Sequence, residues 1–367
     1  MQNVPLLLGA QCSRYSARVR SYLIKKDIAY VERVPTAWTY AVTCKRRFGD
    51  HTMPVLIMPD GEWIADSTII LDRLEVANPD DSIEPPDPVH AFFAALADAW
   101  ASEFWHPVDL GTRWFGRTQY PWWYEELGEG FLCGFPKPLK NALAGKFATM
   151  IQDHLPRIGT TTESAPLIWR WARQMMDALD IHFAQHPYLL GNRATRFDFG
   201  LICPFYGHIA RDPWSRDEYM MPRPRLHAWV WRMQRPYLTP QPPAWPAIGT
   251  PLPATLQPIV RSVFDEFVPW VEGTLAELRR VEPRAVKGKR IARFFGNVSY
   301  PYAGATHART ALPFALWMVQ RSLDRLAAMS AADAQRVRQW VMDSGGARLL
   351  DLEIPRLEVC GLTVRFA

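Results

Sequence analysis

The chain of 367 residues is long enough for two globular domains, or two with an extension, and its 48% hydrophobic and 22% charged residues are an ordinary globular balance. The net charge of +5 is small for this length and long basic runs do not occur, which argues against nucleic-acid binding. Five cysteines without close pairs argue against a disulfide framework and a zinc site, so we expect a reducing cytoplasm and no metal.

The first eighty residues alternate between strand and helix patterns. A short apolar run, residues 5–9, ends at a glycine and predicts a buried strand. Pro59-Asp60-Gly61 separates two further apolar runs and is typical of a hairpin turn. The remaining elements give the order β-α-β-α-β-β-α, with helices at 13–25, 36–47 and 67–76, a second strand at 28–32, and hairpin strands at 55–58 and 62–64.

A polar, proline-rich segment, residues 79–88, cannot continue a helix and is interpreted as a linker after a first domain of residues 1–78. Strand patterns nearly vanish from residue 89, so residues 89–239 are predicted to form an all-α domain. Residues 240–367 are predicted to be a mostly helical C-terminal extension. Its last residues, 357–366, resemble a strand that Gly361 interrupts.

Two features of membrane or exported proteins are not expected. No apolar run approaches the roughly 18 residues that span a membrane. The first residues lack the basic and apolar regions of a signal peptide. We therefore expect no membrane partner.

Cys12 and Ser13 lie at the turn into the first predicted helix, where a helix N-terminus stabilises a thiolate. Taken alone, Ser13 is most simply a helix cap. Met53-Pro54 precedes a buried strand, and a trans peptide bond is the default for such a pair. Asp66-Ser67 opens the predicted helix at 67–76. Both residues favour an N-cap there, and the backbone N–H groups of the helix start can also bind a carboxylate.

Together these motifs resemble the glutathione transferase family, in which a thioredoxin-like N-terminal domain precedes an all-α domain. The segment from Cys12 to Arg20 resembles the family's Ser-Pro-Tyr-Ser and Cys-Pro-Phe-Ala motifs followed by Arg-x-Arg, with Arg14 in place of the usual proline. This alignment implies that Ser13 is the catalytic residue, which donates a hydrogen bond to the sulfur of glutathione. Cys12, one residue earlier, is the competing candidate and would support reductase or lyase chemistry.

The resemblance also implies how glutathione is bound. It makes the Met53–Pro54 bond cis, and the backbone of Met53 then pairs with the cysteinyl part of the tripeptide. It assigns the γ-glutamyl carboxylate to Ser67 and the start of its helix, with Asp66 facing the ammonium. The glycyl carboxylate needs a cation or amide, and four residues are close enough in sequence to provide one: Lys45, Arg46, Arg47 and His51.

A second, independent motif lies in the predicted helical domain. Residues 188–200 resemble the signature of that domain, and Thr195 and Asp198 have the spacing of a capping box, a folding element. His208 is interpreted as a packed helix residue. Aromatic residues of the first helices are candidates to line a pocket for an apolar electrophile, with a helical core as the alternative: Trp100, Phe104, Trp105, Trp114, Trp122, Trp123 and Tyr124.

We therefore expect a cytoplasmic, homodimeric enzyme that activates glutathione and transfers it to an apolar small molecule. Two alternatives stay open: a glutathione-dependent reductase or lyase that uses Cys12, and a non-catalytic binding protein that keeps the fold. Residues 240–367 are not part of the family's common core, and they either close the substrate pocket or extend a dimer interface.

Overall fold

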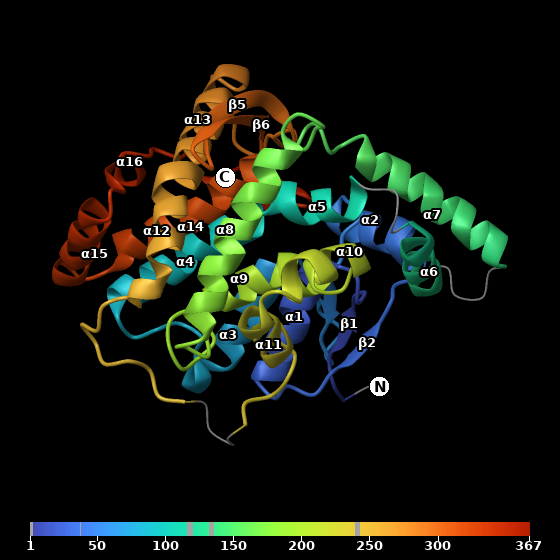
Figure 1. Ribbon diagram of the computed structural model, residues 1–367, viewed down its shortest axis with the longest axis horizontal. Helices are drawn as coiled ribbons and strands as arrows, with labels where there is room; N and C mark the ends of the chain where they lie inside the picture. Colours follow the sequence, from blue (N-terminus) through green and yellow to red (C-terminus); the bar gives the residue numbers. More distant parts are fainter. Residues whose placement is uncertain (1–2, 37, 116–119, 132–135, 239–242) are drawn as a thin grey trace. The chain divides into compact units, whose positions relative to one another are not determined.

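The computed structural model describes residues 3–36, 38–115, 120–131, 136–238 and 243–367 (Figure 1). Its contacts divide the chain into two units. Unit 1 comprises Met1–Ser82, Val108–Leu155 and Leu201–Pro242, and unit 2 comprises Ile83–Pro107, Pro156–Gly200 and Pro243–Ala367. Both units therefore contain segments that are far apart in the sequence. The domain limits predicted at 78 and 88 stay predictions, and the limit at 239/240 lies outside the described residues.

A four-stranded sheet of order β2-β1-β3-β4 belongs to unit 1. Strand β1 (Leu6–Leu8) runs parallel to β2 (Val31–Arg33) and antiparallel to β3 (Val55–Ile57), which pairs with β4 (Trp63–Ala65). The strands form because short apolar runs are bounded by turn residues, and the side chains of Leu7 and Leu56 are fully buried. The predicted thioredoxin-like order is confirmed.

Helices α1 (Arg14–Lys25) and α3 (Ser67–Ala77) pack against each other beside this sheet. The predicted helix at 36–47 is a π-helical segment, η1 (Thr39–Cys44), followed by α2 (Lys45–Phe48). The predicted linker contains one 3₁₀ turn, η2 (Pro79–Asp81). The later segments of unit 1 are helical: α5 (His106–Trp114, which begins in unit 2), α6 (Tyr120–Phe131), α7 (Lys137–Gln152), η3 (Phe205–Ile209), α10 (Pro213–Ser215), η4 (Arg216–Met220) and α11 (Pro224–Met233).

Unit 2 has a helical core that two hairpins accompany. Its helices are α4 (Pro88–Glu103), α8 (Ala165–Phe183), α9 (Arg196–Pro204, which continues into unit 1), η5 (Ala254–Leu256), α12 (Gln257–Ser262), η6 (Val263–Phe267), α13 (Val268–Val281), α14 (Pro313–Ala328), α15 (Ala331–Asp343) and α16 (Ala347–Leu350). The predicted capping box at the start of α9 is present in part: the carboxylate of Asp198 accepts hydrogen bonds from the amide and hydroxyl of Thr195.

The hairpins of unit 2 differ from the prediction. Strands β5 (Phe295–Tyr302) and β6 (Ala305–Ala311) occupy a region for which no strand was predicted, although the extension as a whole is mostly helical, as expected. The predicted final strand is a hairpin of β7 (Leu357–Cys360) and β8 (Thr363–Phe366). Gly361 has a φ of 64°, so it makes the turn between two strands and does not interrupt one.

None of the described helices is long and apolar enough to cross a membrane. Likewise, the described His, Cys, Asp and Glu residues include no group of three or more that could hold a metal ion.

Glu84 connects three segments of unit 2. Its carboxylate accepts a hydrogen bond from Arg196 at the start of α9 and a bidentate pair from Arg325 in α14, at 2.7 and 2.9 Å. Burial raises the pKa of Glu84, but the two guanidinium groups outweigh this effect and lower the pKa to about 2. Glu84 of the predicted linker therefore joins the start of α9 to α14 of the C-terminal extension through ion pairs.

Glu84→Gln should remove a stabilisation that depends on pH. Because the carboxyl's pKa is lowered on folding from 4.5 to about 2, its contribution is present above about pH 4.5 and is lost as the pH falls towards 2. At pH 7 we expect the variant to be about 2–3 kcal/mol less stable, with a flatter profile below pH 4.5, in urea unfolding followed against pH. Glu358→Gln, which breaks an exposed pair with Arg365, is the control and should change stability by less than about 1 kcal/mol. Parallel profiles for wild type and Glu84→Gln would contradict this assignment.

Candidate functional site

The register of the sheet brings the loops that carry the predicted site residues to one end of the strands. Leu8, the last residue of β1, pairs with Val55, the first residue of β3, and Val55 pairs with Ala65, the last residue of β4. The turn that leads to Ser13, the Met53–Pro54 pair and the Asp66–Ser67 pair therefore all leave the sheet at the same end. Adjacent paired residues are about 4.5–5.5 Å apart, so these three loops are neighbours.

Ser13 caps α1. Its backbone is extended (φ −91°, ψ 122°), and its hydroxyl oxygen accepts a hydrogen bond of 3.3 Å from the amide of Ser16. The side chain is half-buried, and this bond uses only an acceptor position of the hydroxyl, so the O–H hydrogen can still be donated to a ligand. The cap and the catalytic assignment are therefore compatible.

The Met53–Pro54 peptide bond is cis, as the family resemblance implied. Pro54 is buried and Met53 is half-buried, directly before the first paired residue of β3. Among the residues that the structure describes, the backbone amide and carbonyl of Met53 have no hydrogen-bond partner. These groups can pair with an extended peptide as an added strand would.

Asp66 caps α3 with an unusual backbone. Its φ of 71° lies in the region that favours glycine, and its carboxylate accepts hydrogen bonds from the amides of Thr68 (2.8 Å) and Ile69 (3.2 Å). Those two amides are therefore occupied. The amide and hydroxyl of Ser67, a residue that is 2% exposed, have no partner within the described part of the chain. In the first turn of α3, the amide and hydroxyl of Ser67 are therefore the groups that can bind a carboxylate.

The two arginines of the Arg-x-Arg motif fix the positions of these loops. The buried guanidinium of Arg18 donates to the hydroxyl of Thr68 at 3.1 Å, which joins α1 to the start of α3. Arg20 forms an ion pair with Glu32 and donates to the carbonyl of Ala10 at 3.2 Å, which joins α1 to β2 and to the residues beyond β1. Both arginines therefore position the site.

Arg113 of α5 anchors the turn before α1 from the other side. Its guanidinium makes a bidentate pair with Asp212 and donates to the carbonyls of Cys12 (2.9 Å) and Gly207 (2.7 Å). Arg113 is 3% exposed and Asp212 is fully buried. A single buried cation thus joins the turn, η3 and the start of α10.

Arg14, which stands where the family has proline, also belongs to this buried charge cluster. Its guanidinium lies 3.0 Å from the carboxylate of Asp109, and both side chains are almost fully buried. Burial raises the pKa of Asp109 to about 6, although Arg14 opposes the effect. His208 is a packed helix residue, as predicted, and its Nδ1 lies 3.0 Å from the carbonyl of Asp109. The departure from the family motif is therefore accommodated by an internal ion pair.

Sequence reasoning did not identify Asp109, Arg113, Gly207 or Asp212 as residues that position the site. Asp109 and Arg113 are four residues apart, a spacing that puts both on one face of a helix. That signal was available, but a pair of opposite charges at this spacing usually lies on a solvated surface.

Cys12 lies in an environment unsuited to a reactive thiolate. It is 7% exposed, and burial raises the pKa of its thiol in spite of the nearby Arg113. A buried thiol with a raised pKa is protonated at neutral pH and reacts slowly. This observation favours Ser13 over Cys12.

The four basic candidates for the glycyl carboxylate are all exposed. Arg47 lies over the ring of Trp63 at 4.6 Å, and His51 stacks on Tyr40 with ring centroids 5.7 Å apart. Lys45 and Arg46 lie in the same short helix as Arg47, α2. The choice among them stays a prediction.

The aromatic residues that were candidates for a pocket lining fall into two groups. Trp100, Phe104 and Trp105 are fully buried in the core of unit 2, so for them the alternative, a helical core, holds. In unit 1, Trp114 of α5 packs on Trp123 of α6 with ring centroids 4.0 Å apart. The remaining two candidates of α6 are half-buried: Trp122 and Tyr124.

Comparison with known proteins places this site in a family context. Residues 7–82 match the family model described as the N-terminal domain of glutathione S-transferase. Similar solved structures include a glutathione S-transferase from Rhodospirillum rubrum F11 (17% identity, 65% of this chain and 96% of that chain covered, TM-score 0.39). A second is the Tau class glutathione S-transferase of mango, Mangifera indica (22% identity, 64% of this chain and 89% of that chain covered, TM-score 0.40). A third is a glutathione S-transferase of Methylobacterium radiotolerans in complex with glutathione sulfonate (19% identity, 68% of this chain and 99% of that chain covered, TM-score 0.38). No curated protein sequence matches the chain.

Proposed function

We propose that the protein binds glutathione and transfers it to an apolar electrophile, on the premise that residues 7–82 match the family model of the glutathione S-transferase N-terminal domain. One observation carries the proposal. The register of β1, β3 and β4 puts the Ser13 turn, the cis Met53–Pro54 pair and the Asp66–Ser67 pair at one end of the sheet.

In this proposal each loop binds a different part of the tripeptide. The unpaired backbone groups of Met53 hydrogen-bond to the cysteinyl residue, and the amide and hydroxyl of Ser67 receive the γ-glutamyl carboxylate. The sulfur then lies at the N-terminus of α1, where the Ser13 hydroxyl donates to it. The hydroxyl and the helix dipole stabilise the thiolate and lower the pKa of the bound thiol.

The chemical step is a nucleophilic substitution or addition. Glutathione gives its thiol proton to water, and a sulfur lone pair forms a bond to an electrophilic carbon. In a substitution, the leaving group departs with the electron pair of the bond that breaks. In an addition, the π bond of the electrophile breaks and its other end takes up a proton from water. An apolar electrophile suits the family context, and a homodimer in a reducing cytoplasm completes the proposal.

The alternative that uses Cys12 has less support, because the Cys12 thiol is buried and its pKa is raised. A non-catalytic protein that keeps the fold differs from the proposal in the transfer step, and it differs in binding as well if it has lost the glutathione site. It would bind glutathione, or lose that binding as well, and would transfer nothing.

Two serine variants separate binding from chemistry. Ser67→Ala should weaken glutathione binding about 10-fold in titration calorimetry, because a charge-assisted hydrogen bond is lost. Ser13→Ala should bind glutathione nearly as wild type does but lower turnover about 10²–10³-fold, since the thiolate loses its donor. The thiolate absorbance of bound glutathione, followed against pH, should shift to higher pH in Ser13→Ala only.

Three results would count against this proposal. Wild type that binds no glutathione at millimolar concentration would reject the site. Binding without transfer to any activated electrophile would leave the non-catalytic alternative. Loss of activity in Cys12→Ala with Ser13→Ala unaffected would establish Cys12 as the reactive residue.

A further inference from the structure

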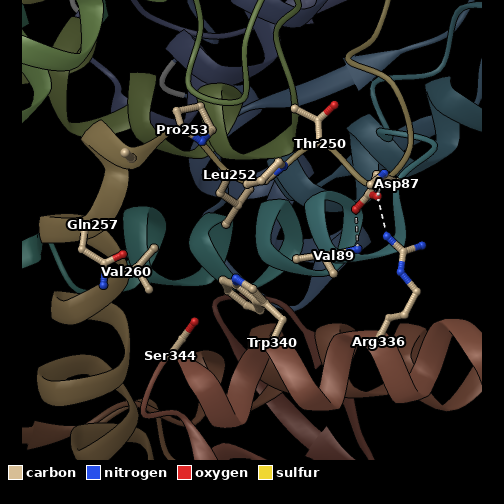
Figure 2. A pocket seen from close by; sticks show the side chains of 13 residues that line it. Asp87, Val89, Thr250, Leu252, Pro253, Gln257, Val260, Arg336, Trp340 and Ser344 are labelled. Atoms are coloured by element: carbon tan, nitrogen blue, oxygen red, sulfur yellow. Dashed lines mark hydrogen bonds and ion pairs between the residues drawn. The ribbon is translucent and has the colours of Figure 1, made fainter.

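A cavity of about 290 Å³ lies within unit 2, between the start of α4, residues 249–254 and α15 (Figure 2). Its walls come from the linker region, the proline-rich segment and the C-terminal extension. None of its lining residues belongs to the glutathione site proposed above, and the inference does not rest on that function.

Hydrogen bonds hold the walls of this cavity in place. The buried carboxylate of Asp87 accepts from the amide of Gly249 at 2.8 Å, and His90 Nε2 lies 2.8 Å from the carbonyl of Thr250. Asp87 also forms an ion pair of 3.0 Å with Arg336 of α15. The proline-rich segment and α15 are therefore both fixed to α4, and the cavity exists without a ligand.

The floor of the cavity is aromatic. The Trp340 ring makes an edge-to-face contact with Phe93 at 5.5 Å and a tilted contact with Phe264 at 5.8 Å. Its indole nitrogen faces the space beneath Leu252, and Val260 lies beside it (Figure 2). Among the described residues, this N–H has no hydrogen-bond partner. A flat apolar ring fits against this surface, with one donor at its edge.

The two ends of the cavity are polar. At one end, Asp87 is stabilised by three backbone amides, those of Val89, His90 and Gly249, and by its position at the N-terminus of α4. The guanidinium of Arg336 lies 3.0 Å from Asp87 and 3.9 Å from Asp333, but its side chain is 41% exposed, so its free side can still contact the anionic group of a ligand. At the other end, the side chains of Gln257 and Ser344 have no partner within the described ranges.

We propose that this cavity binds a small aromatic carboxylate of one or two rings. The ring lies between Trp340, Leu252 and Val260, and the carboxylate forms a charge-assisted pair with Arg336. Gln257 and Ser344 bind a polar group at the far end of the ring. The volume suits one such molecule.

Indole-3-carboxylate and the uncharged indole-3-carboxamide are suitable probes, titrated into the full chain by calorimetry with glutathione present at saturation. We expect the carboxylate to bind with a Kd of about 0.1–1 mM and the carboxamide at least about 10-fold more weakly. Arg336→Met should weaken carboxylate binding about 10-fold and remove the preference over the carboxamide. Arg338→Met, an exposed arginine on the same helix, is the matched control and should leave both affinities unchanged.

Ser344→Phe tests the place of binding independently of charge. The added ring fills the cavity and should abolish binding of both probes, while the melting temperature stays within a few degrees of wild type. Three outcomes would overturn the proposal: no saturable binding to wild type up to about 10 mM, equal affinity for the two probes, or undiminished binding to Ser344→Phe. Because glutathione occupies its own site throughout, failure of this proposal leaves the proposed transferase function untouched.

Discussion

Arg113→Met should lower the free energy of unfolding of unit 1 by about 3–5 kcal/mol, which would make it the most damaging single substitution considered. The guanidinium is buried and donates to Asp212, Cys12 and Gly207. Its removal leaves the carboxylate of Asp212 charged in a low-dielectric environment, and two backbone carbonyls lose their donor. Urea unfolding followed by tryptophan fluorescence measures the effect.

A double variant distinguishes the loss of a cation from general disruption. Arg113→Met with Asp212→Leu removes both charges, and we expect it to be more stable than Arg113→Met alone, because no unpaired buried charge remains. Arg279→Met, at an exposed position of α13, is the control and should change stability by less than about 0.5 kcal/mol. A double variant less stable than the single one would contradict this account of the cluster.

Gly207→Ala should move the turn that carries Ser13. A Cβ on Gly207 would lie 2.5 Å from Cα and 2.7 Å from N of Arg14, and 3.1 Å from the carbonyl carbon of Ser13. All three are backbone atoms, so no change of rotamer relieves the contact. A displacement of about 1 Å at a catalytic group can lower a rate about 100-fold, and we expect a loss of that size in kcat/KM with an activated aryl chloride and glutathione.

Gly145→Ala provides the same chemical change without the contact. Gly145 lies inside α7, and its added Cβ would meet only the end of the Tyr124 side chain at 3.7 Å. This variant should keep full activity and gain up to about 1 kcal/mol of stability from the better helix propensity of alanine. If Gly207→Ala were as active as Gly145→Ala, the close approach of η3 would not be what positions Ser13.

The sequence predicts the N-terminal elements around the proposed site well because their signals are local. Ser13 precedes an amphipathic helix, Pro59-Asp60-Gly61 marks the hairpin, and Asp66 opens α3 as a cap. Each of these depends on residues within a few positions of one another. The Arg113–Asp212 pair joins residues 99 positions apart, and no local pattern predicts such a contact.

The β5–β6 hairpin shows a second reason why pattern reasoning fails. Its turn contains Ala303 with a φ of 50° followed by Gly304, and alanine is an uncommon residue for that conformation. Its inward positions carry polar residues, among them Tyr300, His307 and Arg309, which are buried on the same face. In β6 an alternation of apolar and polar residues, the usual sign of a half-buried strand, is therefore absent.

The interleaving of unit 2 has a consequence for how this protein can change over generations. The indole of Trp100 donates to Ser262, that of Trp171 donates to Glu266, and Glu84 binds Arg325. Each of these pairs unites a residue before position 200 with one beyond position 243. Residues 243–367 therefore cannot be deleted or replaced as an independent domain. A substitution on one side of these contacts constrains which residues are tolerated on the other, so the segments before position 200 and beyond position 243 must evolve together.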